Sequence, residues 1–211
     1  MEFRLEMILQ VLKMFKDMPE GLYKQLYRKK VFIAGAGGLG SNSAMLLIRA
    51  GISNFIIIDY DTIELRNLNR QFYFHHQTGQ KKVESLKTNL LAIQPEAKIE
   101  IINRKMTAEN MSSLIPDDID LLLECFDNPQ SKAELVQYML IHKKEIPVVA
   151  VSGIGGKESL ELIKSKKGPG NLYLVGDGVN GVENGLGTLS SRVMCAAAHQ
   201  AHIAINILIN I

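Results

Sequence analysis

The chain has 211 residues, with 24 lysine and arginine residues against 22 aspartate and glutamate residues, and only two cysteines. This near-neutral balance gives no reason to expect a nucleic-acid or membrane partner, and two cysteines without a Cys-x-x-Cys pair argue against a disulfide framework or a cysteine-based structural zinc site. Charged residues interrupt the N-terminal stretch, unlike a signal peptide, and the apolar tail is too short to span a bilayer. We therefore expect one soluble, cytoplasmic domain over residues 1–211.

The first part of the chain predicts an N-terminal helical arm over residues 1–29. Apolar side chains at helical spacing indicate an amphipathic helix over 3–15, and a second short helix is expected over 22–29.

Strand and helix patterns then alternate. Strands typical of burial on both faces are expected over 31–34, 54–58, 99–103, 119–125 and 146–151, and helices over 39–50, 80–93, 107–114 and 129–143. This alternation predicts an α/β fold, in which a mostly parallel sheet carries helices on both faces.

The pattern loosens after residue 152. A polar stretch over 164–170 precedes a short apolar run over 172–175, and the glycine-rich residues 176–187 are expected to form a loop. An alanine-rich C-terminal helix over 188–209 closes the domain. Because no repeat or linker divides the chain, a single domain is the simplest prediction.

A glycine-rich turn follows the first expected strand and opens a helix. Its glycines are Gly35, Gly37, Gly38 and Gly40. Such a turn lets backbone N–H groups approach a phosphate closely, and the helix N-terminus adds a favourable positive potential. Asp59 ends the next strand, 19 residues beyond Gly40, the spacing at which an acidic residue reaches ribose hydroxyls. The alternative is a tight packing turn without a ligand.

Two further segments carry cationic side chains. Residues 66–71 read Arg-Asn-Leu-Asn-Arg-Gln and could bind phosphate oxygens, although a solvated loop is the simpler interpretation of this composition. Lys82 lies near the start of the helix expected over 80–93, where a lysine opposes the helix dipole. A nearby anion would explain that placement, and so would an ordinary surface lysine.

A third candidate lies after the fourth expected strand. Pro129 suits the first helical position and Asn128 suits the N-cap. Asp127 comes at the carboxyl end of a parallel strand, where open α/β sheets bind ligands. A magnesium ligand is one interpretation of Asp127, and a second helix-start carboxylate is the other. Cys125 and Cys195 are expected to be core residues and not nucleophiles.

Four segments together resemble the ThiF/MoeB/HesA family of ATP-dependent activators of ubiquitin-like proteins. They are residues 35–41 (Gly-Ala-Gly-Gly-Leu-Gly-Ser), 58–71 (Ile-Asp-Tyr-Asp-Thr-Ile-Glu-Leu-Arg-Asn-Leu-Asn-Arg-Gln), 79–85 (Gly-Gln-Lys-Lys-Val-Glu-Ser) and 125–128 (Cys-Phe-Asp-Asn). The ending, over 172–177 and 192–201, is similar to the short, zinc-free ThiF-like branch linked to thiamine biosynthesis.

The resemblance implies a Rossmann-like fold, ATP and Mg²⁺ as cofactors, no structural zinc, and a homodimer. It also implies that the protein adenylates the C-terminal glycine of a small ubiquitin-fold sulfur carrier (ThiS-like), with release of pyrophosphate. This enzyme would be an adenylyltransferase of the ubiquitin-activating type.

The resemblance also assigns roles to residues. Gly38 would lie against the phosphates, Asp59 would hold the ribose, and the other turn glycines and Asn128 would also contact the nucleotide. The polyphosphate contacts would be Asn67, Arg70 and Lys82, the magnesium-linked carboxylate would be Asp127, and the catalytic set would be Arg70, Lys82 and Asp127. No clear equivalent appears for the family's N-terminal arginine, for which Arg4 is a weak candidate, or for a sulfur-transfer cysteine.

Other functions stay open at this point. An NAD-dependent oxidoreductase fits the glycine turn and Asp59 equally well, but it leaves Arg70, Lys82 and Asp127 unexplained. A non-catalytic ATP- or carrier-binding module would keep every binding residue. A tRNA-modifying dehydratase of the same family would activate a small carboxylate, and the absence of a basic surplus argues against it.

Overall fold

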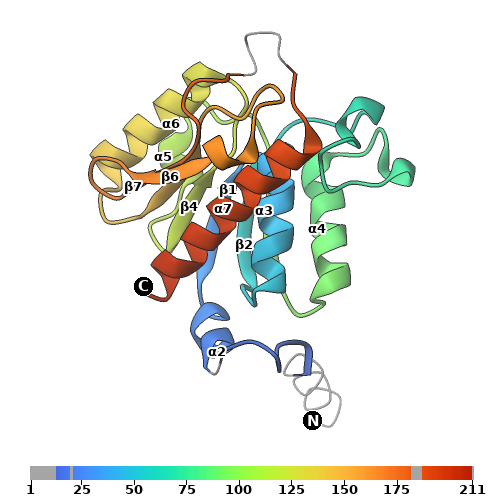
Figure 1. The fold of residues 1–211 in the computed structure, drawn as a ribbon. Helices are drawn as coiled ribbons and strands as arrows, with labels where there is room; N and C mark the ends of the chain where they lie inside the picture. Colours follow the sequence, from blue (N-terminus) through green and yellow to red (C-terminus); the bar gives the residue numbers. More distant parts are fainter. Residues whose placement is uncertain (1–12, 20, 182–186, 211) are drawn as a thin grey trace.

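A computed structural model describes residues 13–19, 21–181 and 187–210, and its strands form one seven-stranded sheet in the order β3-β2-β1-β4-β5-β7-β6 (Figure 1). The strands are β1 (Lys30–Ala34), β2 (Asn54–Asp59), β3 (Lys98–Asn103), β4 (Leu121–Glu124), β5 (Val148–Val151), β6 (Lys164–Lys167) and β7 (Leu172–Gly176). Every neighbouring pair is parallel except β6 and β7, which are antiparallel. The sheet is therefore mostly parallel, as the sequence predicts.

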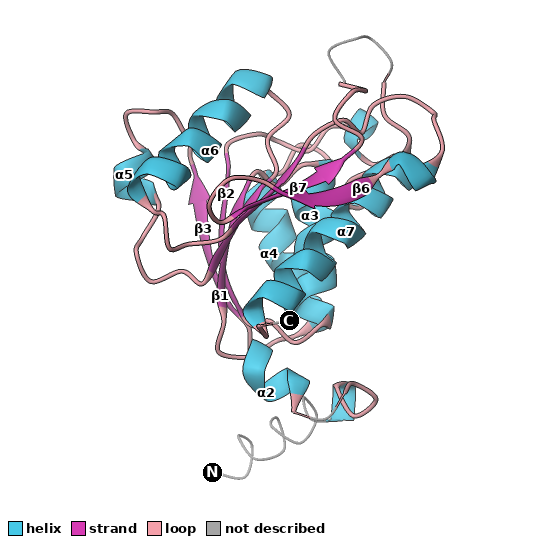
Figure 2. Cartoon of the chain, turned by 60° about the vertical axis from the view of Figure 1, so that its left-hand side comes forward, coloured by secondary structure: helices cyan, strands magenta, loops and turns pink. Residues whose placement is uncertain are grey.

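Helices cover both faces of this sheet. The helices of the described residues are α2 (Leu22–Leu26), α3 (Gly38–Arg49), α4 (Lys82–Ile93), α5 (Met111–Leu114), α6 (Pro129–His142) and α7 (Ser190–Leu208). Figure 2 shows α3, α4 and α7 on one side of the strands and α5 and α6 on the other. The connections also contain three 3-10 turns, η1 (Leu65–Asn67), η2 (His75–Gln77) and η3 (Leu160–Leu162).

Successive side chains of the central strands point to opposite faces of the sheet and contribute to two apolar cores. In β1, Val31 and Ile33 belong to the core under α3, α4 and α7, whereas Phe32 and Ala34 belong to the core under α5 and α6. All four side chains are fully buried. Burial on both faces explains why the strands read as continuous apolar runs.

The C-terminal helix α7 packs along α3 (Figure 1). Its buried residues include four alanines that belong to the core, Ala196, Ala197, Ala201 and Ala204. Small side chains let two helix backbones approach closely. The alanine-rich composition of this segment thus matches its place against a neighbouring helix.

The structure corrects three boundaries. The polar stretch over 164–170 contains the strand β6, whose four residues, Lys-Ser-Lys-Lys, are all exposed at the sheet edge. Lysines are typical of an exposed edge strand, which carries no apolar alternation. The helix expected over 107–114 is reduced to α5, and the one expected over 22–29 ends at Leu26. The helix expected over 3–15 lies mostly outside the described residues. Arg4 lies outside them as well.

None of the described helices is both long and apolar enough to cross a membrane.

Candidate nucleotide-binding site

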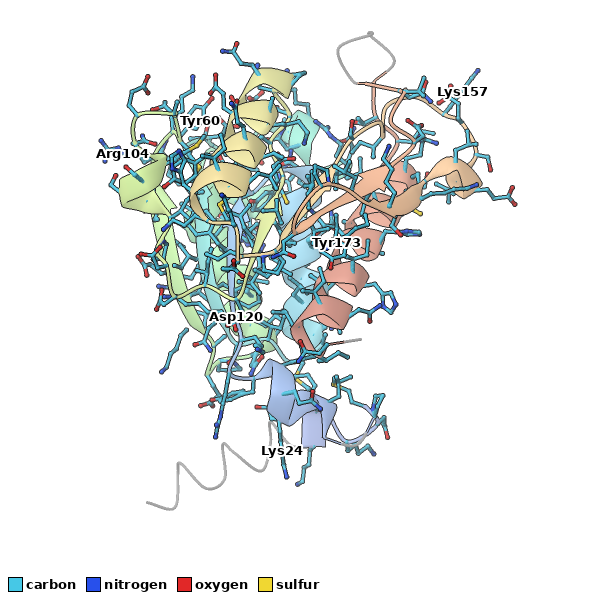
Figure 3. All side chains as sticks on the ribbon, turned by 90° about the vertical axis from the view of Figure 1, so that its left-hand side faces the viewer. Lys24, Tyr60, Arg104, Asp120, Lys157 and Tyr173 are labelled. Carbon is cyan, nitrogen blue, oxygen red and sulfur yellow. The ribbon has the colours of Figure 1, made fainter. Side chains whose placement is uncertain are left out.

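A cleft of about 780 Å³ opens at the carboxyl ends of the parallel strands. Figure 3 labels Tyr60 and Arg104, which line this cleft, at one end of the molecule, and Lys24 and Asp120 toward the opposite end. The lining includes the following predicted site residues: Gly35, Gly37, Gly38, Asp59, Arg70, Lys82, Asp127 and Asn128. Gly40 and Asn67 do not line it. Segments that are far apart in sequence therefore meet where open α/β sheets bind ligands.

The glycine turn is packed tightly against its neighbours. Gly35 has a φ of +102°, and a Cβ atom there would lie 2.9 Å from the carbonyl oxygen of Cys125. A Cβ atom on Gly40 would lie only 1.8 Å from the carbonyl oxygen of Gly35. Gly40 is thus required for packing the start of α3 onto the turn. Gly37 precedes α3 without a side-chain cap, so the N-terminus of this helix faces the cleft with its backbone.

Asp59 is held at the end of β2 by two backbone groups. Its Oδ2 accepts a hydrogen bond from the Ala36 N–H at 2.7 Å, and its Oδ1 accepts one from the Asp61 N–H at 2.8 Å. Tyr73 supports the same turn by donating its hydroxyl to the carbonyl oxygen of Ala36 at 2.7 Å. Burial, together with the charges of Asp59 and Asp61, raises the pKa of Tyr73 well above its ordinary value, so this hydroxyl stays a donor. The carboxylate of Asp59 is therefore fixed relative to the glycine turn.

Asn67 orders the loop that carries Arg70. Its Oδ1 accepts the Glu64 N–H at 3.0 Å, and its carbonyl oxygen accepts the Arg70 N–H at 3.2 Å. From α3, the side chain of Asn42 donates to the carbonyl oxygen of Arg70 at 2.8 Å. Arg70 lines the cleft, and among the described residues its guanidinium bonds only to its own loop, to the carbonyl oxygen of Arg66 at 3.1 Å and to Asn69 Oδ1 at 2.8 Å. Asn67 thus supports the loop without lining the cleft, and the residues of the segment 66–71 that line the cleft are Arg70 and Gln71.

Lys82 forms an ion pair that the sequence does not reveal. Its Nζ lies 2.7 Å from Asp61 Oδ2, and its backbone N–H donates to the carbonyl oxygen of Asp61 at 3.1 Å. The lysine side chain is only 8% exposed, whereas that of Asp61 is 46% exposed. A nearly buried ammonium group needs an anion, and Asp61 supplies one at the wall of the cleft. The anion expected from the position of Lys82 is therefore, in this structure, a carboxylate of the chain itself.

Asp127 and Asn128 begin the segment between β4 and α6. Asn128 is the N-cap of α6, because its Oδ1 accepts the Ser131 N–H at 2.9 Å, and Pro129 is the first helical residue. This confirms the capping prediction. The neighbouring Asp127 is exposed at the cleft, and its carboxylate has no hydrogen-bond partner in the part of the chain that the structure describes.

Asp127 fits a magnesium-nucleotide site. Mg²⁺ takes oxygen ligands and is often held by one or two carboxylates together with the phosphates of a substrate. Within residues 13–19, 21–181 and 187–210, no group of three or more His, Cys, Asp and Glu residues could hold a metal by itself. A cation at Asp127 would therefore need the nucleotide phosphates as further ligands.

Replacing Asn128 with alanine tests the cap directly. Asn128→Ala removes the acceptor for the Ser131 N–H and should lower the free energy of unfolding by about 1 kcal/mol. Denaturant unfolding followed by circular dichroism measures this change. An unchanged unfolding midpoint, or a loss of nucleotide binding at unchanged stability, would contradict the assignment of Asn128 as mainly a cap.

Sequence reasoning missed an ion pair at the cleft, in which Lys132 is a lining residue whose side chain is 20% exposed. Glu124, the last residue of β4, is fully buried, and its Oε2 lies 2.6 Å from the Nζ of Lys132 on α6. The signal was hidden because Glu124 follows three leucines, and its partner lies eight residues further along the chain. Burial raises the pKa of Glu124, and the charge of Lys132 opposes that shift.

Cys125 is not placed for nucleophilic chemistry. Cys125 is buried, its Sγ lies 3.5 Å from Gln200 Oε1, and burial raises the pKa of its thiol. A raised pKa keeps a thiol protonated and unreactive. Cys195 is half-buried on α7. The expectation that Cys125 is a core residue is confirmed.

A buried ion pair supports the loops around residues 153–159 and 177–181. Arg192 is 1% exposed, and its Nη2 lies 2.7 Å from Asp177 Oδ2, while its Nη1 donates to the carbonyl oxygen of Glu158 at 2.6 Å. Burial alone would raise the pKa of Asp177. Hydrogen bonds from Asn180, Val179 and Arg192 outweigh burial and lower this pKa to about 2.

This lowered pKa predicts a loss of stability in acid. Because the folded carboxylate binds protons more weakly than the unfolded one, its contribution is complete above pH 4 and disappears as the pH falls from about 4 to about 2. The contribution is on the order of 2 kcal/mol. Urea unfolding from pH 5 to pH 2 should show a shallower loss of stability for Asp177→Asn than for the wild type. Parallel curves for the two proteins would contradict the prediction.

The sheet order, the glycine turn and the cleft at the strand ends define an α/β domain of the Rossmann type. The family model described as the ThiF family matches residues 10–208. The chain therefore belongs to the ThiF family.

Two curated relatives show how far the sequence likeness extends. Ubiquitin-like modifier-activating enzyme 5 of Caenorhabditis elegans is 36% identical over 120 residues, which cover 52% of this chain and 29% of that protein. Molybdopterin-synthase adenylyltransferase of Haemophilus influenzae is 37% identical over 113 residues, which cover 53% of this chain and 46% of that protein. This chain thus spans less than half the length of these relatives.

Solved structures confirm the fold. E. coli tRNA N6-threonylcarbamoyladenosine dehydratase in complex with ATP superposes with a TM-score of 0.83 at 20% identity, covering 94% of this chain and 93% of that one. E. coli MccB with ATP gives a TM-score of 0.69 at 21% identity, covering 89% and 58%. At these identities the likeness shows the shared fold and carries no assignment of substrate.

Proposed function

We propose that this protein is an ATP-dependent adenylyltransferase that activates the C-terminal glycine carboxylate of a small ubiquitin-fold carrier. In this reaction a carboxylate oxygen attacks the α-phosphorus of ATP, the bond to the β-phosphate oxygen breaks, and pyrophosphate leaves. The products are an acyl adenylate and pyrophosphate. Membership in the ThiF family and likeness to an adenylyltransferase and a modifier-activating enzyme support the proposal.

One observation carries the proposal beyond family membership. Asp59, Arg70, Lys82 and Asp127, from four separate segments, line one cleft beside the glycine turn. An attacking carboxylate and a triphosphate are both anionic, so the site must offset negative charge as pyrophosphate departs. Fixed cations in a preorganised site stabilise such charge. Arg70 and Lys82 would supply them, while Asp59 would bind the ribose hydroxyls.

Magnesium belongs to the same proposal. When bound, Mg²⁺ would withdraw charge from phosphate oxygens as a Lewis acid, and Asp127 is the residue that would hold it. The backbone of the glycine turn would position the phosphates. None of these steps needs a nucleophile from the protein, which is consistent with the buried Cys125.

Family membership and the two cationic residues in the cleft, Arg70 and Lys82, favour this function over an NAD-dependent oxidoreductase. We further propose a sulfur carrier of the ThiS type as the partner, on the resemblance of the C-terminal segment, and a homodimer as the assembly, since two-fold dimers are the commonest oligomers. The cytoplasmic location stays a prediction.

The test is ATP–pyrophosphate exchange with candidate carriers, each with and without its terminal glycine. We expect magnesium-dependent exchange only with the intact carrier. Exchange with a small carboxylate alone would favour a dehydratase-type substrate instead. Binding of ATP without exchange under any condition would favour a non-catalytic module.

A further inference from the structure

We propose that the ion pair of Glu124 and Lys132 positions the backbone next to Asp127 and thereby orients the Asp127 carboxylate. This orientation sets how much Mg²⁺ increases the affinity for ATP. This inference rests on the proposed nucleotide site, but not on carrier adenylation.

The pair holds both polar backbone groups of the residue before Asp127. Oε1 of Glu124 accepts the Phe126 N–H at 2.7 Å, and Nζ of Lys132 donates to the carbonyl oxygen of Phe126 at 2.9 Å. The Lys132 ammonium and the Glu124 carboxylate lie 2.6 Å apart, so the three hydrogen bonds form a closed ring with the backbone of Phe126. The peptide that links Phe126 to Asp127 is therefore held by Lys132, and Asp127 needs no side-chain partner to be oriented.

The same segment is fixed from the other side. The Cys125 N–H donates to the carbonyl oxygen of Ala34 at 2.9 Å, and the carbonyl oxygen of Cys125 lies against Gly35 of the turn. After it, Asn128 caps α6. The exposed carboxylate of Asp127 thus extends from a backbone anchored on both sides, at the wall of the cleft.

Stability alone does not account for this pair. A fully buried carboxylate at the end of a central strand has a large desolvation cost, and an apolar pair of similar volume is often at least as stable. An ionic pair does offer something that apolar side chains cannot. It satisfies an N–H and a C=O of the loop at once and fixes their directions.

The experiment compares ATP affinity in Mg²⁺ with ATP affinity in EDTA by calorimetry, using the complete chain. The wild type should bind ATP more tightly in Mg²⁺. Lys132→Met should lose about tenfold or more of that magnesium-dependent gain, because residues that orient a metal ligand typically affect metal affinity by 10- to 100-fold. Its affinity in EDTA should change by less than about threefold, because Lys132 lines the cleft but its charge is already neutralised by Glu124, and the glycine turn and Lys82 are left in place.

Two variants serve as controls. Lys132→Arg keeps a donor for both Glu124 and the Phe126 carbonyl and should recover most of the gain. Lys143→Met makes the same substitution just beyond the other end of α6, where Lys143 pairs with Asp117, and should leave the gain unchanged.

A second measurement is independent of any ligand. In Glu124→Gln, which keeps the size of the side chain, the Phe126 amide should exchange with solvent at least tenfold faster than in the wild type, since an amide donates more strongly to a carboxylate than to a neutral oxygen. Unchanged protection of this amide would overturn the proposal.

The remaining outcomes separate the alternatives. Equal losses of affinity in Mg²⁺ and in EDTA for Lys132→Met would mean that Lys132 contacts the nucleotide itself, which overturns the positioning role. A wild-type magnesium gain in Lys132→Met would overturn it as well. If the wild type binds magnesium-ATP but exchanges no pyrophosphate, the proposed enzyme activity fails, while the binding comparison still decides the role of this pair.

Discussion

Asp127→Ala should lower kcat for ATP–pyrophosphate exchange by about 10²-fold or more, the typical loss when one electrostatic contact to a reacting phosphate is removed. Asp127 is exposed at the cleft, and its carboxylate has no partner among the residues the structure describes. Its removal should therefore leave the free energy of unfolding within about 0.5 kcal/mol of the wild type. The initial rate of exchange in saturating ATP, pyrophosphate and carrier measures the effect.

The neighbouring residue is the control for this prediction. Asn128→Ala changes the same loop but removes a helix cap, so it should cost stability and retain most of the activity. Raising the magnesium concentration should restore part of the activity of Asp127→Asn if the residue holds the cation. A variant at Asp127 with activity close to the wild type would remove the magnesium role from the proposed mechanism.

The core of the fold could be predicted because its signals are local. β1 and β4 are apolar on both faces, and this burial produces the continuous runs seen in the sequence. The strand β6 could not be predicted in this way. Among the described strands it pairs with β7 alone, and its exposed lysines carry no apolar pattern. The identity of an edge strand is decided by a contact with a distant segment, which a local pattern does not contain.

The residues of the candidate site also differ in how far the sequence could predict them. Asp59 could be located because it ends a recognisable strand, whereas local patterns left Arg70, Lys82 and Asp127 open and the family resemblance assigned them; the structure brings all four to the cleft. Asn67 shares the motif of Arg70 but does not line the cleft, since periodicity does not indicate the direction of a side chain in an irregular segment. Gly40 fits the glycine pattern but serves the packing of α3.

Charge pairing was the least predictable feature. Asp61 lies two residues after Asp59, yet its partner, Lys82, comes 21 residues later along the chain. An isolated bridge between Thr62 and Lys81 brings the two segments together. Only the fold places these carboxylate and ammonium groups at hydrogen-bond distance. The pairing also means that a bound triphosphate would share an ammonium group that already has one anionic partner.

Lys82→Met should lower kcat/KM for exchange by about 10²- to 10³-fold, comparable to the loss of one preorganised donor to developing charge. Methionine has nearly the shape of lysine and suits a position that is only 8% exposed. Asp61, left without its cation, is 46% exposed and can be hydrated, so the free energy of unfolding should change by less than about 1 kcal/mol.

The adjacent lysine provides the matched control. Lys81 is half-buried and does not line the cleft, and its Nζ donates to the carbonyl oxygen of Tyr60 at 3.1 Å outside the ion pair. Lys81→Met therefore removes the same charge from the same helix start and should change kcat/KM by less than about threefold. If both substitutions reduce exchange equally, the effect comes from the net positive charge near the cleft. In that case the specific contact between Lys82 and the departing pyrophosphate must be abandoned.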